Sequence, residues 1–453
     1  MSAALDMSLI PPLGEPRPQP VPVAAESTLA NGLRVVVVPR PGVPLIELRL
    51  RVPFAATGAP SAEAHTAEGS VLSGAVLLGT ASHDQTGIAQ LLQGHGAEMA
   101  VSSDSDRLLF GTTLLPGGLR PVLAVLAELL TTATYPADGV EGERDRLAER
   151  ITIALSQPSV LARSALGARR YAGHPYAISL PDPGLVAAVT GEDLRRLHRE
   201  RVLPAGSTLV LVGDLDPAGA ADAVAEALAG WTGTGAAAES EPATSLHSPV
   251  VELVDRPGAV QSNIRLGGPA PTRTDPDLAA ARLAAMVFGG YFSSRLVENI
   301  RERRGYSYSP RSSVEHLAGG ASFLVEADVA TEVTGPALME TVYELGRMAL
   351  TPVTEAELDA ARRYVLGSMA LSTATHAGLA STLSALVGAG LPVGWLAEHQ
   401  RALEAVTVDQ VQEVSRRYLA PGALTAVVVG DAAEVEAQLA ALGPLTVRRD
   451  ADA

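Results

Sequence analysis

The sequence contains no cysteine and no lysine among its 453 residues. Disulfide bonds and thiolate-bound metals are therefore excluded, and arginine supplies every basic side chain apart from histidine. Basic residues are also outnumbered, because 34 arginines face 50 acidic residues and the net charge is −16. That balance argues against non-specific nucleic-acid binding, which needs a basic surface. Together with abundant Ala and Gly, the missing lysine is typical of a bacterial coding sequence of high GC content.

A targeting segment and a convincing membrane span are also missing. Residues 1–25 are rich in proline, contain Asp6 and Glu15, and lack a basic start followed by a long apolar core. We therefore expect a disordered leader and a cytoplasmic protein. Residues 377–397 carry no charge over a membrane-spanning length, but their Ser, Thr, Gly and Pro residues favour a buried helix that ends before Leu391.

The length predicts more than one domain, because 453 residues exceed a single ordinary core. Residues 189–214 align without gaps onto residues 406–431, with nine identities in 26 positions. Each copy predicts a helix, a proline stop, a buried strand and a Gly-Asp pair, which indicates an internal duplication. We expect an α+β fold of two homologous αβ domains, 26–231 and 250–446, each a mixed or antiparallel sheet covered by helices on one side. Residues 232–249 have the composition of a flexible linker.

Local patterns place the elements of these domains. Period-two or β-branched runs predict strands after the Asn31-Gly32 turn and at 47–52, 207–212, 250–254, 263–266 and 322–329. Small, apolar or amphipathic patterns predict helices at 67–79, 119–130, 141–155, 182–202 and 277–288, and long helices that begin at Gly335, Thr354 and Thr407.

The segment 289–308 organises the second domain. Its two leading glycines end one helix, Ser293 or Ser294 caps the next, and Gly305 supplies a stop before a strand. Arg301 lies at the margin of the apolar edge of this helix, and Tyr308 lies on the strand that follows. One turn could bring the guanidinium and the phenol together beside a groove. The alternative is a solvated arginine and a half-buried tyrosine with no function.

This segment resembles the "GG-F-S-S-R-L…R-E-x-x-G-x-x-Y" motif in the C-terminal half of the M16 zinc metallopeptidases, the group of pitrilysin, insulysin and mitochondrial processing peptidase. The resemblance implies that Arg301 and Tyr308 hold the substrate backbone against a zinc site and that Phe292 and Ser294 contact substrate. "ELDAARRYVLGSMALS…VT…V…RRYLAP…VVVGD" resembles the short bacterial members, subfamily M16B. His174-Pro175-Tyr176 resembles a structural turn of the family. The implied fold is half of a clamshell, LuxS-like or like mitochondrial processing peptidase, that encloses a peptide chamber.

The zinc ligands of that family are missing. Its active members carry His-x-x-Glu-His on one helix and a further Glu on a later helix. Aligned on Leu77-Leu78-Gly79-Thr80, this sequence has Ser70 and Gly74 in the histidine positions and Ser73 in the position of the general base. Arg150 occupies the third ligand position, with Glu149 one residue off. Catalytic zinc requires three protein ligands, so the comparison implies no metal cofactor in this chain.

The sequence offers little evidence for other catalytic motifs. His65 and Glu68 form a lone His-x-x-Glu, which offers at most two metal ligands. The sequence has no phosphate-binding loop, because no Lys-Ser/Thr follows Gly289-Gly290, and no Gly-x-Ser-x-Gly nucleophile elbow.

The resemblance therefore implies a subunit that is inactive alone and forms a heterodimer with a His-x-x-Glu-His subunit of subfamily M16B, in which zinc is expected. In that pair, Arg301 and Tyr308 position an extended peptide for hydrolysis. A second hypothesis is a non-enzymatic scaffold or peptide-binding protein, like the M16-related core proteins of respiratory complexes. A homodimeric peptidase with its own metal is disfavoured by the missing ligands. Peptide maturation and general peptide turnover both stay open.

Overall fold

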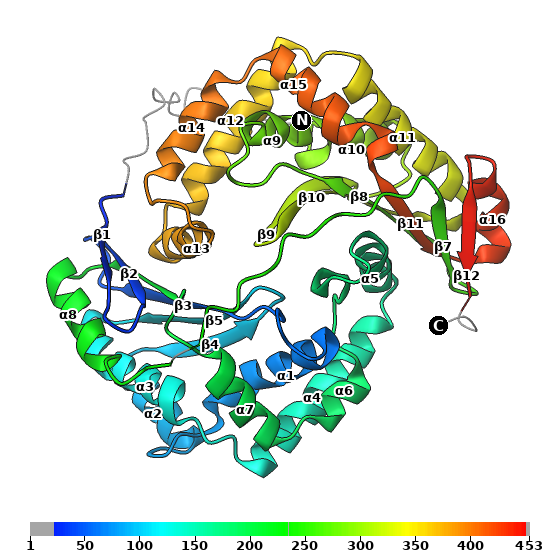
Figure 1. Cartoon of the computed structure of the whole chain (residues 1–453). Coiled ribbons are helices and arrows are strands. Elements are labelled where there is room, and N and C mark those ends of the chain that lie inside the picture. The colour runs from blue at the N-terminus through cyan, green and yellow to red at the C-terminus, as the bar shows by residue number, and fades with distance from the viewer. Residues whose placement is uncertain (1–21, 234, 450–453) are drawn as a thin grey trace, which may run out of the picture.

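The computed structural model describes residues 22–233 and 235–449, which form two halves built on one six-stranded sheet each (Figure 1). The first sheet has the order β1 (Ala25–Thr28), β2 (Arg34–Pro39), β6 (Thr208–Gly213), β3 (Ile46–Pro53), β5 (Arg107–Leu114), β4 (Glu98–Ser103). The second has the order β12 (Leu445–Arg448), β7 (Val251–Asp255), β11 (Thr425–Gly430), β8 (Gln261–Pro269), β10 (Gly320–Ala330), β9 (Arg311–Leu317). The expected leader lies outside the described residues except for residues 22–25, the last of which begins β1.

The two sheets follow one plan, which confirms the predicted α+β fold. In each, a central strand from the repeated segment, β6 or β11, pairs parallel with one neighbour and antiparallel with the other. Only the outer strands differ: β1 runs antiparallel to β2, whereas β12 runs parallel to β7. The sheets are therefore mixed, and the repeat at the constant offset marks equivalent places in the two halves.

Helices cover both sheets. The first half contains α1 (Ala62–Ala75), α2 (Gln85–Gln93), α3 (Leu119–Thr132), α4 (Ala137–Leu155), α5 (Pro158–Arg170), α6 (Pro183–Ala188), α7 (Gly191–Arg201) and α8 (Pro217–Ala227). The second contains α9 (Leu278–Ala285), α10 (Arg295–Val297), α11 (Thr334–Leu350), α12 (Glu355–Ser372), α13 (His376–Val387), α14 (Trp395–Ala405), α15 (Val408–Val414) and α16 (Ala432–Ala440). Wider, π-helical turns extend three of them at Met286–Gly290, Glu298–Arg303 and Ser415–Leu419.

Two expected helix boundaries were wrong, and in both places a helix cap explains the difference. The helix expected at 182–202 is two helices, because the Thr190 side chain and Asp193 form a reciprocal cap that starts α7 afresh. The helix expected from residue 67 begins at Ala62, because Ser61 accepts a hydrogen bond from the backbone N–H of Ala64.

Each half lends one helix to the other. Helix α13 of the second half packs on β6 and β3 of the first sheet, and α5 of the first half packs on β11 and β8 of the second (Figure 1). These contacts form two apolar clusters. One joins Leu379, Ala380, Leu383 and Val387 to Val36, Val38, Val210 and Val212. The other joins Ala162, Ala165 and Leu166 to Val254, Leu324, Val427 and Val429. The expectation of helices on one side only was therefore wrong, since each sheet has one borrowed helix on its other face.

This exchange also accounts for the uncharged stretch at 377–397, most of which is α13. Its apolar side chains are buried against the first sheet. Among the described helices, none is both long and apolar enough to cross a bilayer.

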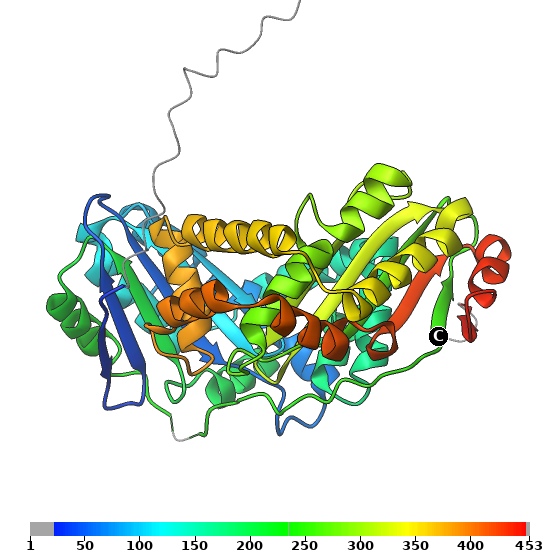
Figure 2. The same ribbon diagram turned by 90° about the horizontal axis from the view of Figure 1, so that it is seen from above.

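The expected linker is held in place despite its flexible composition. Its described residues run in extended conformation from one half to the other, a course visible along the lower side of Figure 2. Backbone hydrogen bonds tie it to both: the Ala55 amide donates to the Ala238 carbonyl over 2.9 Å, and the Ala243 amide to the Gly319 carbonyl over 2.8 Å. Residues 232–249 therefore act as part of the junction.

A buried carboxylate adds to this junction. Asp106, at the start of β5, accepts hydrogen bonds from the Tyr176 hydroxyl at 2.6 Å and from the Ala318 amide at 2.8 Å. The Tyr176 hydroxyl accepts one from the Gly319 amide at 2.7 Å. The His-Pro-Tyr turn of the first half thus holds the β9–β10 turn of the second.

We expect Leu383→Ala, in the middle of α13, to destabilise the chain by about 2–5 kcal/mol, the usual cost of truncating a fully buried leucine. Denaturant unfolding measures the loss, and amide exchange locates it in β2 and β6 of the other half. Leu371→Ala is the control, because Leu371 on α12 is 77% exposed. Faster exchange confined to the second half would contradict the borrowed-helix arrangement.

Candidate functional site

The segment 289–308 folds as a helix, a turn, a short helix and a loop. The π-helical end of α9 stops at Gly290, and α10 continues through the π-helical turn to Arg303. Leu296 and Ile300 are fully buried and anchor this second helix. Gly305 has a φ of +67°, a left-handed conformation that costs least without a Cβ. Tyr308 lies in the loop before β9, so its expected place on a strand was wrong.

The structure brings three predicted site residues together at the surface. The guanidinium carbon of Arg301 lies 5.0 Å from the ring centre of Phe292 and 4.7 Å from that of Tyr308. Phe292 is 61% exposed and Tyr308 80% exposed, so these aromatic rings face solvent. Each cation–π contact at such a site contributes roughly 0.5–1 kcal/mol. We call Phe292, Arg301 and Tyr308 the aromatic–arginine cluster.

The cluster has unused hydrogen-bond donors. The Nε of Arg301 lies 3.1 Å from an oxygen of Glu302. Within the described part of the chain, the terminal amino groups of Arg301 and the hydroxyl of Tyr308 have no recorded partner. Strand β9 begins at Arg311 and forms the edge of its sheet, with only β10 paired to it. A guanidinium and a phenol beside an open strand edge can donate to backbone carbonyls.

Ser294, the fourth predicted site residue of this segment, is not part of the exposed cluster. It is 1% exposed, and its hydroxyl has no partner among the described residues. It occupies the position before α10, but its side chain does not cap the helix. The helix is held instead by Arg295, which binds Glu357 of α12 through two hydrogen bonds of 2.7 and 2.9 Å. Although burial opposes it, hydrogen bonding by Arg295 and Thr354 lowers the pKa of Glu357 to about 2.

Ser70, Ser73 and Gly74, which occupy the aligned positions of the two histidines and the general base, lie on α1, and the two serine hydroxyls are used within the helix. The Ser70 hydroxyl donates to the Thr66 carbonyl over 2.7 Å, and the Ser73 hydroxyl donates to the Ser70 carbonyl over 2.9 Å. Gly74 has no side chain, and a Cβ there would overlap the carboxylate of Glu143 on α4.

Glu143 fills the space that faces Gly74. Its carboxylate pairs with Arg146 at 2.8 Å and with Arg150 at 3.3 Å. Glu149, one residue before the aligned third ligand position, lines the same small depression. Arg150, in the position aligned with the third metal ligand, thus pairs with the Glu143 carboxylate together with Arg146. The residues present do not fit a zinc ion, and no group of three or more His, Asp or Glu among the described residues is arranged to hold a metal.

The lone His-x-x-Glu is also structural. The Nε2 of His65 lies 2.8 Å from the Phe54 carbonyl, and Glu68 forms an ion pair with Arg196 at 2.8 Å. Burial lowers the pKa of His65. The two side chains therefore serve different neighbours.

Comparison with known proteins agrees with this geometry. Residues 188–365, which include Arg301 and Tyr308, match the family described as the Peptidase M16 inactive domain. An uncharacterized zinc protease of Mycobacterium tuberculosis is 27% identical over 425 residues, which cover 89% of this chain and 94% of the relative. The non-peptidase homolog YmxG of Helicobacter pylori is 23% identical over 78% of this chain and 82% of its own length.

Solved structures give the same result. The peptidase M16 inactive domain from Pseudomonas fluorescens superposes with a TM-score of 0.83 at 25% identity, over 90% of this chain and 98% of its own. Similarity to M16 peptidases therefore extends over about nine-tenths of the chain. A protease from Helicobacter pylori shares the fold, with a TM-score of 0.83 at 18% identity over 90% of this chain and all of its own. The chain combines the fold of these structures with serine, glycine and arginine in the aligned metal positions.

We expect the purified chain to retain far less than one equivalent of zinc, because no three ligands converge. Elemental analysis after dialysis measures the metal content. Chelator should leave the thermal midpoint unchanged, since a bound metal would stabilise the folded state by mass action. An M16 peptidase with an intact His-x-x-Glu-His motif, treated in parallel, is the control. One tightly held equivalent in this chain would contradict the assignment.

Proposed function

We propose that this chain is the non-metal-binding subunit of a heterodimeric M16 peptidase, in which it holds an extended peptide for a zinc site on a partner chain. The observation that carries the proposal is the contrast between the two halves. The aligned metal positions of the first half lack ligands, whereas the cluster of the second half presents the exposed Tyr308 hydroxyl and the terminal amino groups of Arg301, for which the described residues supply no partner.

The cluster supports a role in substrate positioning. Its cation and phenol stand next to the open edge of β9, to which an extended peptide can add as a further strand. Main-chain pairing of this kind tolerates many sequences. Arg301 and Tyr308 then donate hydrogen bonds to substrate carbonyls near the scissile bond.

Such donors matter most in the transition state. The carbonyl oxygen of the substrate gains negative charge during hydrolysis, for which a zinc site on the partner would supply the activated water. By analogy with oxyanion holes, the loss of one aimed donor costs about 2.7–4 kcal/mol of activation free energy. The chain alone lacks the hydroxide source, so peptide hydrolysis requires the partner, a His-x-x-Glu-His subunit.

A scaffold is the second candidate. The relative named a non-peptidase homolog favours it, since a chain of this fold can exist without peptidase function. The Tyr308 hydroxyl and the terminal amino groups of Arg301 favour the peptidase complex, because a scaffold has no need for hydrogen-bond donors without partners at this place. The rate and assembly measurements on Tyr308→Phe, given next, separate the two candidates.

We expect Tyr308→Phe to lower kcat of the assembled pair by about 100- to 1000-fold, since only the donated hydrogen bond is lost. The ring remains, so contact with Arg301 and assembly should persist. A peptide-cleavage assay with the co-purified partner measures the rate, and size-exclusion chromatography measures assembly.

Tyr343→Phe is the matched control. Tyr343 on α11 is 58% exposed and also lies under an arginine, with Arg347 6.0 Å from its ring centre. It should leave kcat unchanged. A partner that needs this chain but is indifferent to Tyr308→Phe would support the scaffold instead.

A further inference from the structure

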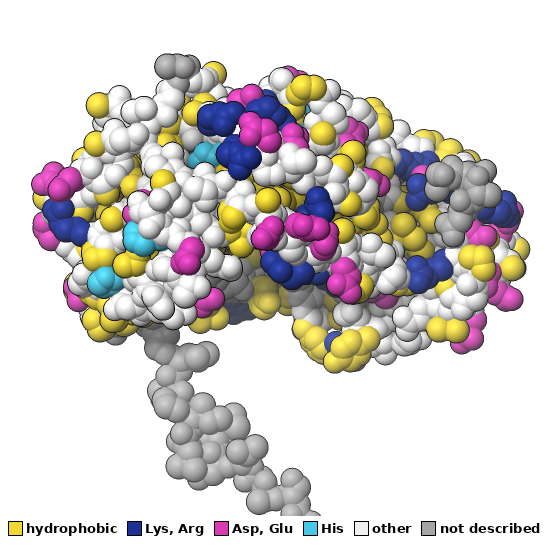
Figure 3. Space-filling view, turned by 90° about the horizontal axis from the view of Figure 1, so that it is seen from below, with side chains coloured by type: hydrophobic (Ala, Val, Ile, Leu, Met, Phe, Trp, Pro, Cys, Tyr) yellow, Lys and Arg dark blue, Asp and Glu magenta, His cyan; other side chains and the backbone are white. Residues whose placement is uncertain are grey.

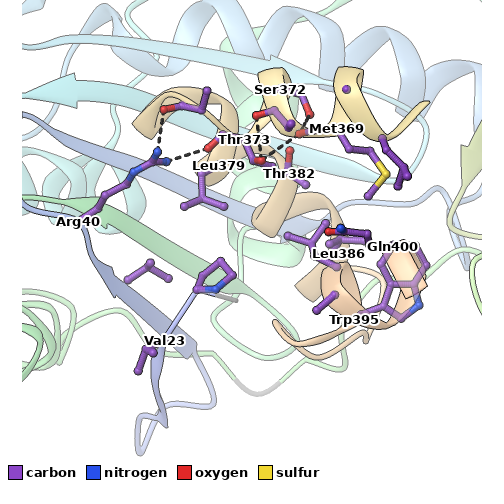
Figure 4. A pocket seen from close by; sticks show the side chains of 18 of the residues that line it. Val23, Arg40, Met369, Ser372, Thr373, Leu379, Thr382, Leu386, Trp395 and Gln400 are labelled. Carbon is purple, nitrogen blue, oxygen red and sulfur yellow. Dashed lines mark hydrogen bonds between the residues drawn. The ribbon is translucent and has the colours of Figure 1, made fainter. Parts of the chain in front are cut away.

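A large cavity lies at the seam between the two halves, apart from both regions described above. Its volume is about 1090 Å³, in the upper range of small-molecule sites. The end of β2 forms one wall, and α12, α13 and α14 form the others (Figure 4). Apolar side chains supply much of the lining, namely Val38, Leu366, Met369, Leu379, Leu386 and Trp395.

Two arginines line this cavity without an acidic partner. Arg282 on α9 contacts only uncharged groups, the Nε2 of His399 at 3.1 Å and the sulfur of Met369 at 3.7 Å. Arg273 has no recorded hydrogen bond or ion pair with any residue in the described ranges. Burial lowers the pKa of both guanidinium groups, and no carboxylate offsets this effect. Both side chains are half-buried, and removing a cation from water without a counter-ion costs free energy.

Two histidines near these arginines are affected by their charges. Burial, followed by the charges of Arg273 and Arg282, lowers the pKa of His316 to about 4. Burial and Arg282 likewise lower the pKa of His399 to about 4. Both imidazoles are thus neutral at neutral pH. The Nδ1 of His316 is buried and has no partner among the described residues.

The remaining charged groups of the lining do not neutralise the pair. Glu404, the one acidic residue among the described lining residues, accepts a hydrogen bond from Gln400 at 3.1 Å. Arg40 donates to the carbonyls of Thr373 and Ala374 after α12, as Figure 4 shows. Arg363, which also lines the cavity, is exposed and forms no ion pair within the described ranges. Elsewhere, for example on the face in Figure 3, acidic and basic side chains are interspersed.

We propose that this cavity binds an apolar monocarboxylate, whose carboxylate pairs with Arg273 and Arg282 and whose apolar body fills the space between β2 and the helices. The carboxylate supplies the missing counter-ion, and the aliphatic and tryptophan side chains bury the rest. Free fatty acids and the C-termini of short apolar peptides share this chemistry. The site goes beyond the proposed peptidase role and does not depend on it.

The test is calorimetric titration of the full chain with dodecanoate below its micelle concentration. We expect one saturable site. Dodecanol, which lacks the charge, should bind far more weakly. Arg282→Met should weaken dodecanoate binding about 10- to 100-fold, the usual value of a charge-assisted hydrogen bond. Arg120→Met is the control, because Arg120 is an exposed arginine of α3 paired with Glu226.

A second variant tests the cavity without touching the arginines. Gly367 of α12 lines the cavity, and a Cβ there meets no atom within 4 Å. Gly367→Phe should place a benzyl group in the cavity and weaken binding while the fold persists, as circular dichroism reports. A short apolar peptide with a free C-terminus, compared with its amidated form, distinguishes the two sources of carboxylate. Failure of both acids to bind, equal binding of dodecanol, or binding unaffected by both cavity variants would overturn the proposal.

Discussion

The reciprocal exchange of α5 and α13 is the constraint on which the rest of the structure depends. Each sheet has two apolar faces, and the helices of its own half cover only one. The other face is buried by a helix from the opposite half. Neither half can therefore complete its core alone, and their relative orientation is fixed by apolar packing. The hydrogen bonds of Asp106 and Tyr176 set the register at the centre of this junction.

This fixed orientation gives the chain three separate regions. The aromatic–arginine cluster lies beside the open edge of the second sheet, while α1 and α4 carry the aligned metal positions in the first half. The cavity lies where α13 crosses to the first sheet, so it exists only because the halves are joined. The junction between the halves thus sets where the cluster lies relative to the cavity.

The charged groups around the aligned metal positions differ from those of the cavity. At α1 and α4, Glu143 is already paired with Arg146 and Arg150, so the region has no need of an ion. In the cavity, Arg273 and Arg282 lack any acidic partner among the described residues. The first arrangement is complete in the free chain, whereas the second is completed by a ligand. This difference is why the cavity, and not the aligned metal positions, is the better candidate for a small-molecule site.

The sequence by itself determined the duplicated α+β plan and the glycine turn at Gly305, because hydrophobic periodicity and a left-handed glycine are local properties. It also placed Arg301 and Tyr308 in one segment, short enough for their contact to be local. Only the tertiary structure decided which helix covers which sheet, that Ser294 is buried and that Glu143 occupies the space beside Gly74. The sequence does not predict that Arg273 and Arg282 line a cavity, for the same reason. Their lack of partners depends on side chains distant in the chain, and no sequence pattern records a counter-ion that is absent.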